Sequence, residues 1–351
     1  MREKLIKISR RRDYWTYLAV IVAFAVLTYL ANSGSMKRAH MALLVPVCCY
    51  IVAALALNLC VGILGELSLG HAGFMSIGAF SGIIVSQSLI NVIPNTGLRL
   101  LIAILIGAVL AGIFGFLIGI PVLRLKGDYL AIVTLAFGEI IKDLVNCLIV
   151  GIDSKGLHVL FNATGTKTVA DLQLDETGTA IIQGAQGAVG TTTISSFTAG
   201  FLLIMVTLFI VQNLVKSCTG RTIMAIRDNR IAAESCGINV TGYKMTAFAL
   251  SAAIAGAAGV LYGLNYSSIV ATKFNFNTSI LILVYVVLGG LGNIQGTLIA
   301  ATLLYVLPEL LRAFSDYRML VYAIVLIVVM LVTNNKKIRQ FFVKTKKRED
   351  D

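Results

Sequence analysis

Long apolar runs, separated by short polar or basic segments, occupy most of the chain. A helix needs about 20 apolar residues to cross the hydrocarbon core of a bilayer, and about ten runs come near that length. They lie at residues 14–31, 41–61, 71–90, 98–121, 128–150, 196–215, 245–266, 278–289, 297–313 and 318–333. The pattern predicts an all-α integral membrane protein with about ten transmembrane helices.

The composition excludes two other classes of protein. Hydrophobic residues make up 58% of the chain and charged residues 13%, whereas soluble domains have about 45–50% and about 25%. A soluble globule this apolar would lack the polar side chains that cover a surface, and a disordered chain would need low hydrophobicity. A protein that spans the membrane several times remains.

The basic residues predict the orientation of the spans. The formal net charge is +12, and most of the 29 Lys and Arg gather in residues 2–12, 124–126, 216–244 and 336–348. Ten spans place these four segments on one side, which the positive-inside rule identifies as the cytoplasm. We therefore expect cytoplasmic basic termini at residues 1–13 and 334–351, on either side of a transmembrane domain at 14–333. The basic tail lacks the aromatic platform of a nucleic-acid-binding module, so we expect contact with lipid and none with nucleic acid.

Two connections between the spans are long. The outer one, residues 151–195, is rich in Gly, Thr and Asp and forms either a small cap or an elongated loop. It either contacts an external partner or is a passive, mobile loop.

The inner connection, residues 216–244, contains the signals of a short helix. Asp228 or Asn229 can cap its start, and Gly237 can supply the left-handed residue at its end. A helix of about two turns is unstable alone. This one has no bulky apolar anchor for a lipid surface, so a groove in another protein is the better partner.

The chain lacks the motifs of common enzymes. It contains no phosphate-binding G-x-x-x-x-G-K-[ST] run, no H-E-x-x-H and no G-x-S-x-G. Its three histidines are too scattered for a metal site to be predicted. These absences favour a transporter or a structural protein over an enzyme.

Glu139 is the clearest ionisable residue within a predicted span. Charged groups at membrane depth are costly and are candidates for function. Lys142 lies at i+3 and could pair with Glu139, and Asp143 lies at i+4. Glu139 either faces a wet path or orders the helices beside it; alternatively, it is a paired carboxylate that only fixes packing.

Glycine-rich segments interrupt the apolar runs at residues 62–73 and 288–296. Broken backbone in a membrane exposes amides and carbonyls that can line a pathway. The positions of the two breaks suggest duplicated halves, although tight turns between helices would give the same pattern. We take their polar residues, with Glu139, as candidates for the translocation path: Glu66, Ser68, His71, Glu139, Asn293 and Gln295.

Small residues recur at four-residue spacing on two spans. Gly115 and Gly119 form one pair, and Ala255, Gly259 and Gly263 form a stripe. This spacing predicts close packing of helices.

Several stretches resemble a known family. They are LNLCVGILGELSLGHAGFMSIGAF (57–80), PVLRLKGDYLAIVTLAFGEIIK (121–142), GRTIMAIRDNRIAAESCGINVTGYKMTAFALSAAIAGAAGVLYG (220–263), VVLGGLGNIQGT (286–297) and LPELLRAFSDYRML (307–320). The chain resembles the permease subunits of branched-chain amino acid ABC importers, of the LivM type. Such permeases carry a cytoplasmic E-A-A-x-x-x-G motif that docks on the ATPase. It aligns here with residues 231–237, where Ile231 replaces the acidic first residue.

The resemblance implies a set of partners and a location. The partners are a sister permease in a heterodimer, two ABC ATPase subunits, an extracytoplasmic amino acid-binding protein and the lipid bilayer. The ATPases would hydrolyse ATP, so this chain would bind no cofactor or metal, and the complex would lie in the bacterial cytoplasmic membrane. The expected coupling residues are Arg227, Asp228, Asn229, Arg230, Ile231, Ala232, Ala233, Glu234 and Gly237. A permease for urea or short amides, or an ATP-independent secondary transporter, is the alternative.

Overall fold

The computed structural model describes most of the chain. It covers residues 2–33, 37–90, 92–125, 127–153, 156–162, 167–173, 175 and 178–311, with isolated positions at 320, 323, 324 and 327; the side chains of residues 2–13 and 39 are not described. The predicted basic tail and most of the predicted span 318–333 lie outside the described residues.

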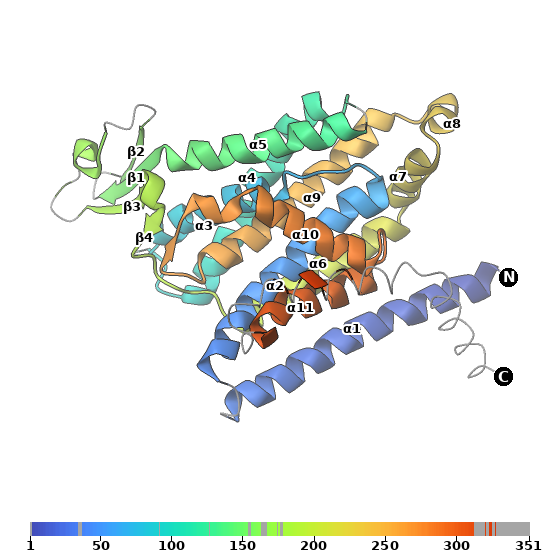
Figure 1. The fold of residues 1–351 in the computed structure, drawn as a ribbon, viewed down its shortest axis with the longest axis horizontal. Helices are drawn as coiled ribbons and strands as arrows, with labels where there is room; N and C mark the ends of the chain where they lie inside the picture. The colour runs from blue at the N-terminus through green and yellow to red at the C-terminus, as the bar shows by residue number, and fades with distance from the viewer. Residues whose placement is uncertain are drawn as a thin grey trace.

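Helices form the body of the molecule (Figure 1). In chain order they are α1 (Arg2–Asn32), α2 (Arg38–Asn58), a π-helix (Leu59–Leu64), α3 (His71–Ser88), α4 (Thr96–Val122), α5 (Asp128–Asn146), α6 (Phe197–Lys216), α7 (Cys218–Asp228), α8 (Arg230–Ser235), α9 (Val240–Gly263), α10 (Phe276–Gly289) and α11 (Ile294–Leu310). Short 3-10 turns lie at Val169–Leu172, Gly184–Gln186 and Ala271–Phe274. Every predicted span up to residue 313 therefore contains a helix.

Five helical segments of the described chain are long and apolar enough to cross a membrane. They are Tyr14–Asn32, His40–Leu64, Thr96–Val122, Phe197–Lys216 and Val240–Gly263. The apolar helices α10 and α11 are shorter. A mostly helical protein with several membrane spans agrees with the prediction.

The prediction of an all-α chain is wrong at one end of the molecule. A five-stranded antiparallel sheet in the order β2-β1-β3-β4-β5 joins β1 (Leu148–Asp153), β2 (Gly156–Phe161), β3 (Thr179–Gln183), β4 (Ala188–Val189) and β5 (Ser268–Ile269). The helix predicted to reach residue 150 ends at Asn146, and the outer connection forms a small cap. Periodicity alone cannot separate the end of an apolar helix from a buried strand, and the buried Ile149 and Val150 are β-branched residues that favour the strand.

Glycines bring the central helices into backbone contact. A Cβ at Gly259 on α9 would collide with the carbonyl of Met75 on α3, and one at Gly115 on α4 would collide with Ala252. Such close approach is typical of helix packing in membranes. The predicted stripes of small residues therefore do form packed seams.

Two broken helices are the main irregular features of the body. After α2, residues 59–70 lead to α3, and after α9, residues 264–275 lead to α10. The segments have equal length, and the first turns of α3 and α10 meet, because the Ala72 amide donates to Ser279 Oγ at 3.2 Å. The counterpart of the first break is therefore segment 264–275. The glycine-rich run at 288–296, which the sequence suggested, instead turns the chain between α10 and α11.

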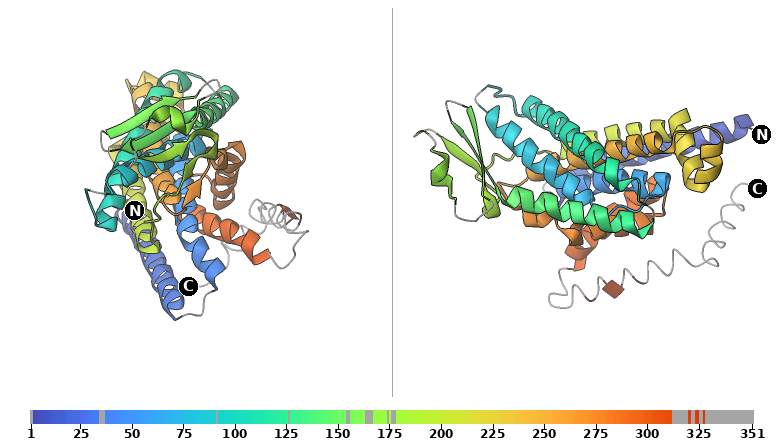
Figure 2. Two further views of the ribbon diagram at one scale, coloured as in Figure 1. Left: turned by 90° about the vertical axis from the view of Figure 1, so that its left-hand side faces the viewer. Right: turned by 90° about the horizontal axis from the view of Figure 1, so that it is seen from above.

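The two ends of the molecule differ. The sheet lies at one end, whereas α7, α8 and the start of α1 lie at the other (Figures 1 and 2). The predicted outer and inner connections are thus at opposite ends of the molecule.

Candidate functional site

The inner connection folds as two short helices, α7 and α8. Asn229 has extended backbone, and its Oδ1 accepts a hydrogen bond from the Ala232 amide at 3.1 Å, so Asn229 rather than Asp228 caps α8. Gly237 ends the segment with a φ of +78°, and its amide donates to the Glu234 carbonyl at 3.0 Å. The predicted start and stop signals of the short helix are confirmed, and α7 is an element that the sequence reading missed.

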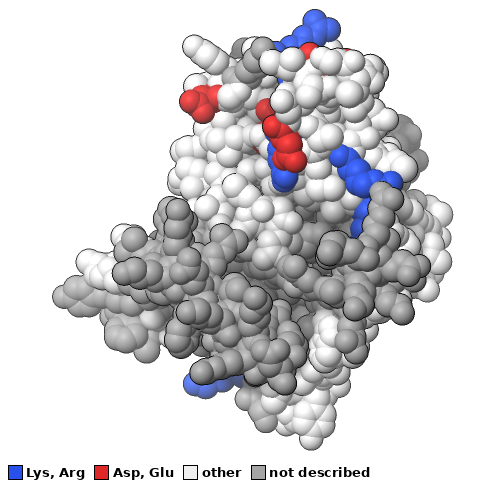
Figure 3. Space-filling model, turned by 90° about the vertical axis from the view of Figure 1, so that its right-hand side faces the viewer, with Lys and Arg blue, Asp and Glu red and all other residues white. Residues whose placement is uncertain are grey.

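Helix α8 packs against the body of the molecule through one buried side chain. Ala233 is buried against Ile226 and Val240, whereas Ile231 is 77% exposed and Ala232 and Glu234 are exposed as well. Arg230 Nε donates to Glu234 Oε1 at 2.9 Å. Figure 3 views this end and shows acidic and basic side chains next to each other among the described residues. A small exposed helix on a packed base is suited to fit a groove.

Arg227, at the end of α7, connects this helix to the body. Its Nη1 donates to the Gly62 carbonyl in the π-helix at 2.9 Å, while Nε and Nη2 donate to Asp228 Oδ1 at 3.1 and 2.9 Å. Gly65 has a φ of +81°, and a Cβ there would lie 2.5 Å from Arg227 Cγ. Arg227 and Asp228, which were predicted as coupling residues, are both exposed, and Arg227 also joins α7 to the first break.

The turn between α10 and α11 packs against the same π-helix. The Gly292 amide donates to Asn58 Oδ1 at 2.8 Å. A Cβ at Gly62 would collide with that amide nitrogen and with Asn58 Oδ1. The end of α7, the π-helix and the α10–α11 turn therefore interlock at Gly62.

Ser68 and His71 lie in a buried polar network. Ser68 Oγ is 3.3 Å from His71 Nδ1, and His71 Nε2 is 2.7 Å from Ser251 Oγ on α9. Ser251 Oγ in turn donates to the Ala56 carbonyl at 2.6 Å. Ser68 and His71 are each 1% exposed. These two predicted path residues hold the first break against α2 and α9.

Two further contacts fix the first break. Glu66 forms an ion pair with Lys244 on α9, with both side chains largely buried. The Leu69 amide donates to Thr134 Oγ1 on α5 at 3.0 Å. The segment is therefore tied to α5 and α9 by polar contacts, which buried backbone and charge require in a low-dielectric interior.

Glu139 is fixed between two helices. It forms the predicted ion pair with Lys142, and its Oε1 accepts from the Phe276 amide at 2.9 Å. Phe276 begins α10, where the positive end of the helix dipole favours a carboxylate. Of the interpretations that the sequence left open, this contact favours a carboxylate that orders the neighbouring helices.

The six predicted path residues are not brought into one site. Asn293 and Gln295 lie at the start of α11, where Gln295 Nε2 donates to Thr16 Oγ1 of α1 at 2.5 Å. Ser68 and His71 are in the interior, and Glu139 of α5 contacts the start of α10. Among the described residues, no group of three His, Cys, Asp or Glu side chains could hold a metal ion.

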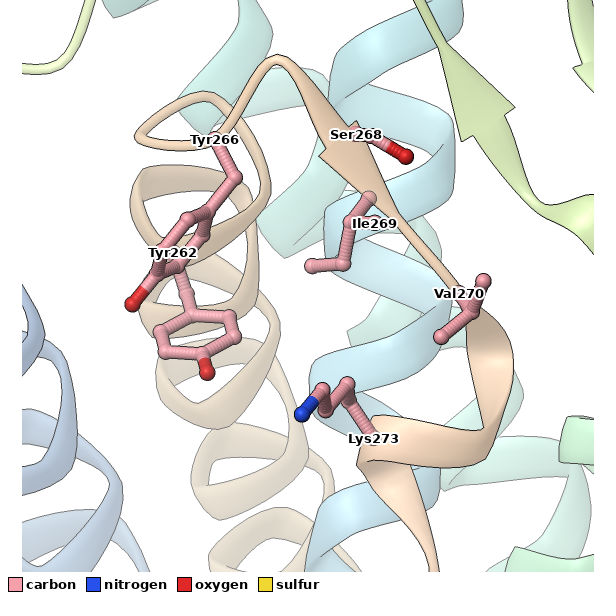
Figure 4. A pocket seen from close by; sticks show the side chains of 6 residues that line it. All are labelled: Tyr262, Tyr266, Ser268, Ile269, Val270 and Lys273. Atoms are coloured by element: carbon pink, nitrogen blue, oxygen red, sulfur yellow. The ribbon is translucent and has the colours of Figure 1, made fainter.

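The sequence reading also missed a pocket of about 180 Å³ near the sheet. Its lining residues are Tyr262, Tyr266, Ser268, Ile269, Val270 and Lys273 (Figure 4). All of them come from the end of α9 and the second break. No motif marks these positions, and the only available signal was a tyrosine pair followed by a lysine within a mostly apolar region.

Comparison with known proteins gives a family match over most of the chain. The family described as "Branched-chain amino acid transport system / permease component" matches residues 40–330. The chain is 33% identical over 320 residues to the high-affinity branched-chain amino acid transport system permease protein LivM of Salmonella typhimurium, covering 90% of this chain and 72% of that one. It is 26% identical over 298 residues to the probable LivM permease of Methanocaldococcus jannaschii, covering 76% and 79%. It is 27% identical over 290 residues to the LivH permease of Escherichia coli, covering 81% and 89%.

Proposed function

The chain belongs to the branched-chain amino acid permease family, and from this premise we propose that it is a membrane subunit of a binding-protein-dependent ABC importer for branched-chain, hydrophobic amino acids. It is a transport subunit, not an enzyme. The observation that carries the proposal is the exposed helix α8, which is linked through Arg227 to the broken helix at Gly62. An importer driven by a separate ATPase needs such an inward-facing lever.

The proposed complex has four kinds of subunit. A sister permease pairs with this chain, two ABC ATPases bind and hydrolyse ATP at the α8 end, and an amino acid-binding protein docks at the sheet end. Similarity to both a LivM and a LivH permease supports a pair of related membrane subunits. The complex would lie in the bacterial cytoplasmic membrane, which this chain would cross about ten times, with both of its termini in the cytoplasm.

Motion would pass from the ATPases to the membrane through named contacts. Closure of the ATPases moves α8, and α7 moves with it because Ala233 and Ile226 share one small core. Arg227 then shifts Gly62, and the neighbouring Gly292 carries the shift to α10 and α11. The first turns of α3 and α10, which meet at Ala72 and Ser279, would separate and rejoin. This is alternating access by rigid-body motion around broken helices.

The test is reconstitution of the whole complex with its binding protein. We expect leucine, isoleucine or valine to stimulate ATP hydrolysis and ATP-dependent uptake into vesicles. Stimulation by urea or short amides instead would favour the alternative permease class. Accumulation of solute by this chain in the absence of nucleotide would contradict the proposal and indicate a secondary transporter.

A further inference from the structure

The pocket at the second break combines three kinds of surface. Lys273 is exposed, and Figure 4 shows that its ammonium group and the Tyr262 hydroxyl point toward the same space. The rings of Tyr262 and Tyr266 form one side, and the aliphatic side chains of Ile269 and Val270 form the other. The pocket thus offers a cation, aromatic faces and an apolar wall.

The charge of Lys273 is available to a ligand. Among the ion pairs formed by described residues, none includes Lys273. A lysine ammonium donates three hydrogen bonds and binds carboxylates. The pocket volume of about 180 Å³ suits a small solute, since sites for drug-sized ligands measure roughly 300–1,000 Å³.

The tyrosine side of the pocket is held in place by further rings. The centroids of Tyr262 and Tyr266 are 5.1 Å apart, with an interplanar angle of 61°. Tyr50 of α2 packs edge-on against Tyr262 at 5.8 Å and lies 4.7 Å from Tyr305 of α11. Rings that are already ordered lose little entropy when a ligand binds. Their faces attract an ammonium group by a cation–π interaction.

The outer sheet supports the strand beside the pocket. Strand β5 pairs with β4, with Ala188 opposite Ile269. Thr191 Oγ1 donates to the carbonyls of Tyr266 and Ser267 at 2.9 and 3.1 Å. A protein that docks on the sheet would therefore touch the same structural unit that forms the pocket.

We propose that this pocket receives a free aliphatic amino acid on the outer side of the permease. Lys273 binds the α-carboxylate, the faces of Tyr262 and Tyr266 bind the α-ammonium group, and Ile269 and Val270 contact the side chain. The assignment of the solute class rests on the proposed function. The residues differ from the translocation path expected from the sequence, and they directly precede α10 in the chain.

The first test measures uptake by the reconstituted complex with loaded binding protein. Loss of a charge-assisted contact costs about 1.5–3 kcal/mol, so we expect Lys273→Met to lower the uptake rate roughly tenfold or more. Lys273→Arg should keep most of the rate, because the charge remains. Lys37→Met, at an exposed lysine at the start of α2, is the matched control and should leave uptake unchanged. Equal uptake by Lys273→Met and wild type would overturn the proposal, while failure of the wild type to transport any aliphatic amino acid would instead contradict the proposed function.

The second test detects binding directly, in the complex without its binding protein. An amine-reactive reagent is applied and labelling of Lys273 and Lys37 is measured by mass spectrometry. The free amines of leucine and leucinol also consume the reagent, so both are used at the same concentration and labelling of Lys273 is expressed relative to Lys37. Leucine should lower this ratio, whereas leucinol, which lacks the carboxylate, should leave it unchanged. The experiment is repeated in nanodiscs of phosphatidylcholine and of phosphatidylglycerol. Absence of protection by leucine, or protection by phosphatidylglycerol alone, would overturn the proposal and, in the second case, identify a lipid headgroup as the ligand.

Discussion

The two helix breaks are equal in length but have different surroundings. The break at residues 59–70 is held by side chains, including the pair Glu66–Lys244 and the network from Ser68 through His71 to Ser251. The break at residues 264–275 is held by strand pairing with β4 and by Glu139 at the start of α10. The first adjoins α7, and the second adjoins the tyrosine pocket. Under the function and the pocket that we propose, one break receives motion from the inner end and the other receives solute from the outer end.

The largest effect is expected from a substitution that separates the π-helix from its neighbours, because this tests the role assigned to the first break. Gly62→Val places a branched side chain where the Gly292 amide and Asn58 Oδ1 already lie. Overpacking of this kind costs about 1–3 kcal/mol or more, so we expect reduced assembly, a lower melting temperature in detergent and no coupled transport. Gly138→Ala is the control, because its Cβ would meet its nearest neighbour at an ordinary 3.5 Å. A Gly62→Val complex with wild-type melting and transport would contradict the interlock.

Removing Arg227 tests whether the first break is the one that responds to the ATPases. Arg227→Met removes the hydrogen bond to Gly62 and leaves the pocket at the second break untouched. We expect roughly a tenfold or greater loss of transport per ATP hydrolysed, with assembly kept. Arg227→Lys should restore little, because lysine lacks the planar fork of donors.

Arg221→Met is the control for this experiment. Arg221 is exposed on the same helix, and its guanidinium donates to the nearby Lys216 carbonyl and to Cys218 Sγ. Full coupling in Arg227→Met would show that the link to Gly62 carries no motion.

Gly237→Val tests only the turn that ends α8. Gly237 has a φ of +78° and open space around its Cβ position, so the effect of a substitution is conformational rather than steric. A left-handed residue with a side chain costs about 1–2 kcal/mol, and we expect about a five- to thirtyfold loss of ATPase stimulation by loaded binding protein. Gly237→Asn should be much milder, because Asn tolerates this region. Full stimulation in Gly237→Val would contradict docking through α8.

Glu139→Gln gives the smallest expected effect and sharpens the description of the second break. The Oε1 atom of the new glutamine can still accept a hydrogen bond from the backbone amide of Phe276, but the negative charge that interacts with the helix dipole is lost. Loss of this charge–dipole interaction costs about 0.3–1 kcal/mol, so uptake should fall up to about fivefold without loss of assembly. Asp143→Asn is the control, since Asp143 is more exposed and lies 3.5 Å from Lys142. Unchanged uptake would return Glu139 to a role in packing only.

Local signals in the sequence predicted local structure well. The cap at Asn229 and the left-handed Gly237 were both identifiable, because each acts on residues within one turn. The apolar runs located the helices for the same reason. The pair Glu139–Lys142 followed from i,i+3 spacing on a helix.

The missed features depend on contacts between distant residues. The hydrogen bond between Arg227 and the Gly62 carbonyl joins residues 165 positions apart. The cap sheet includes β5, which is separated from β4 by all of α6 to α9. Hydrophobic periodicity contains no information on contacts between residues that are far apart in the sequence.

The glycine-lined seams of α9 limit which parts of the permease can move. A Cβ at Gly256 would collide with Ala111 of α4, and one at Gly78 of α3 would collide with the Gly256 carbonyl. Backbones at this separation cannot slide or tilt independently without a clash, because packed interiors resist continuous deformation. Helices α3, α4 and α9 therefore form a fixed frame. Conformational change has to occur at its borders, and spin labels placed within the frame should keep constant separations throughout the transport cycle.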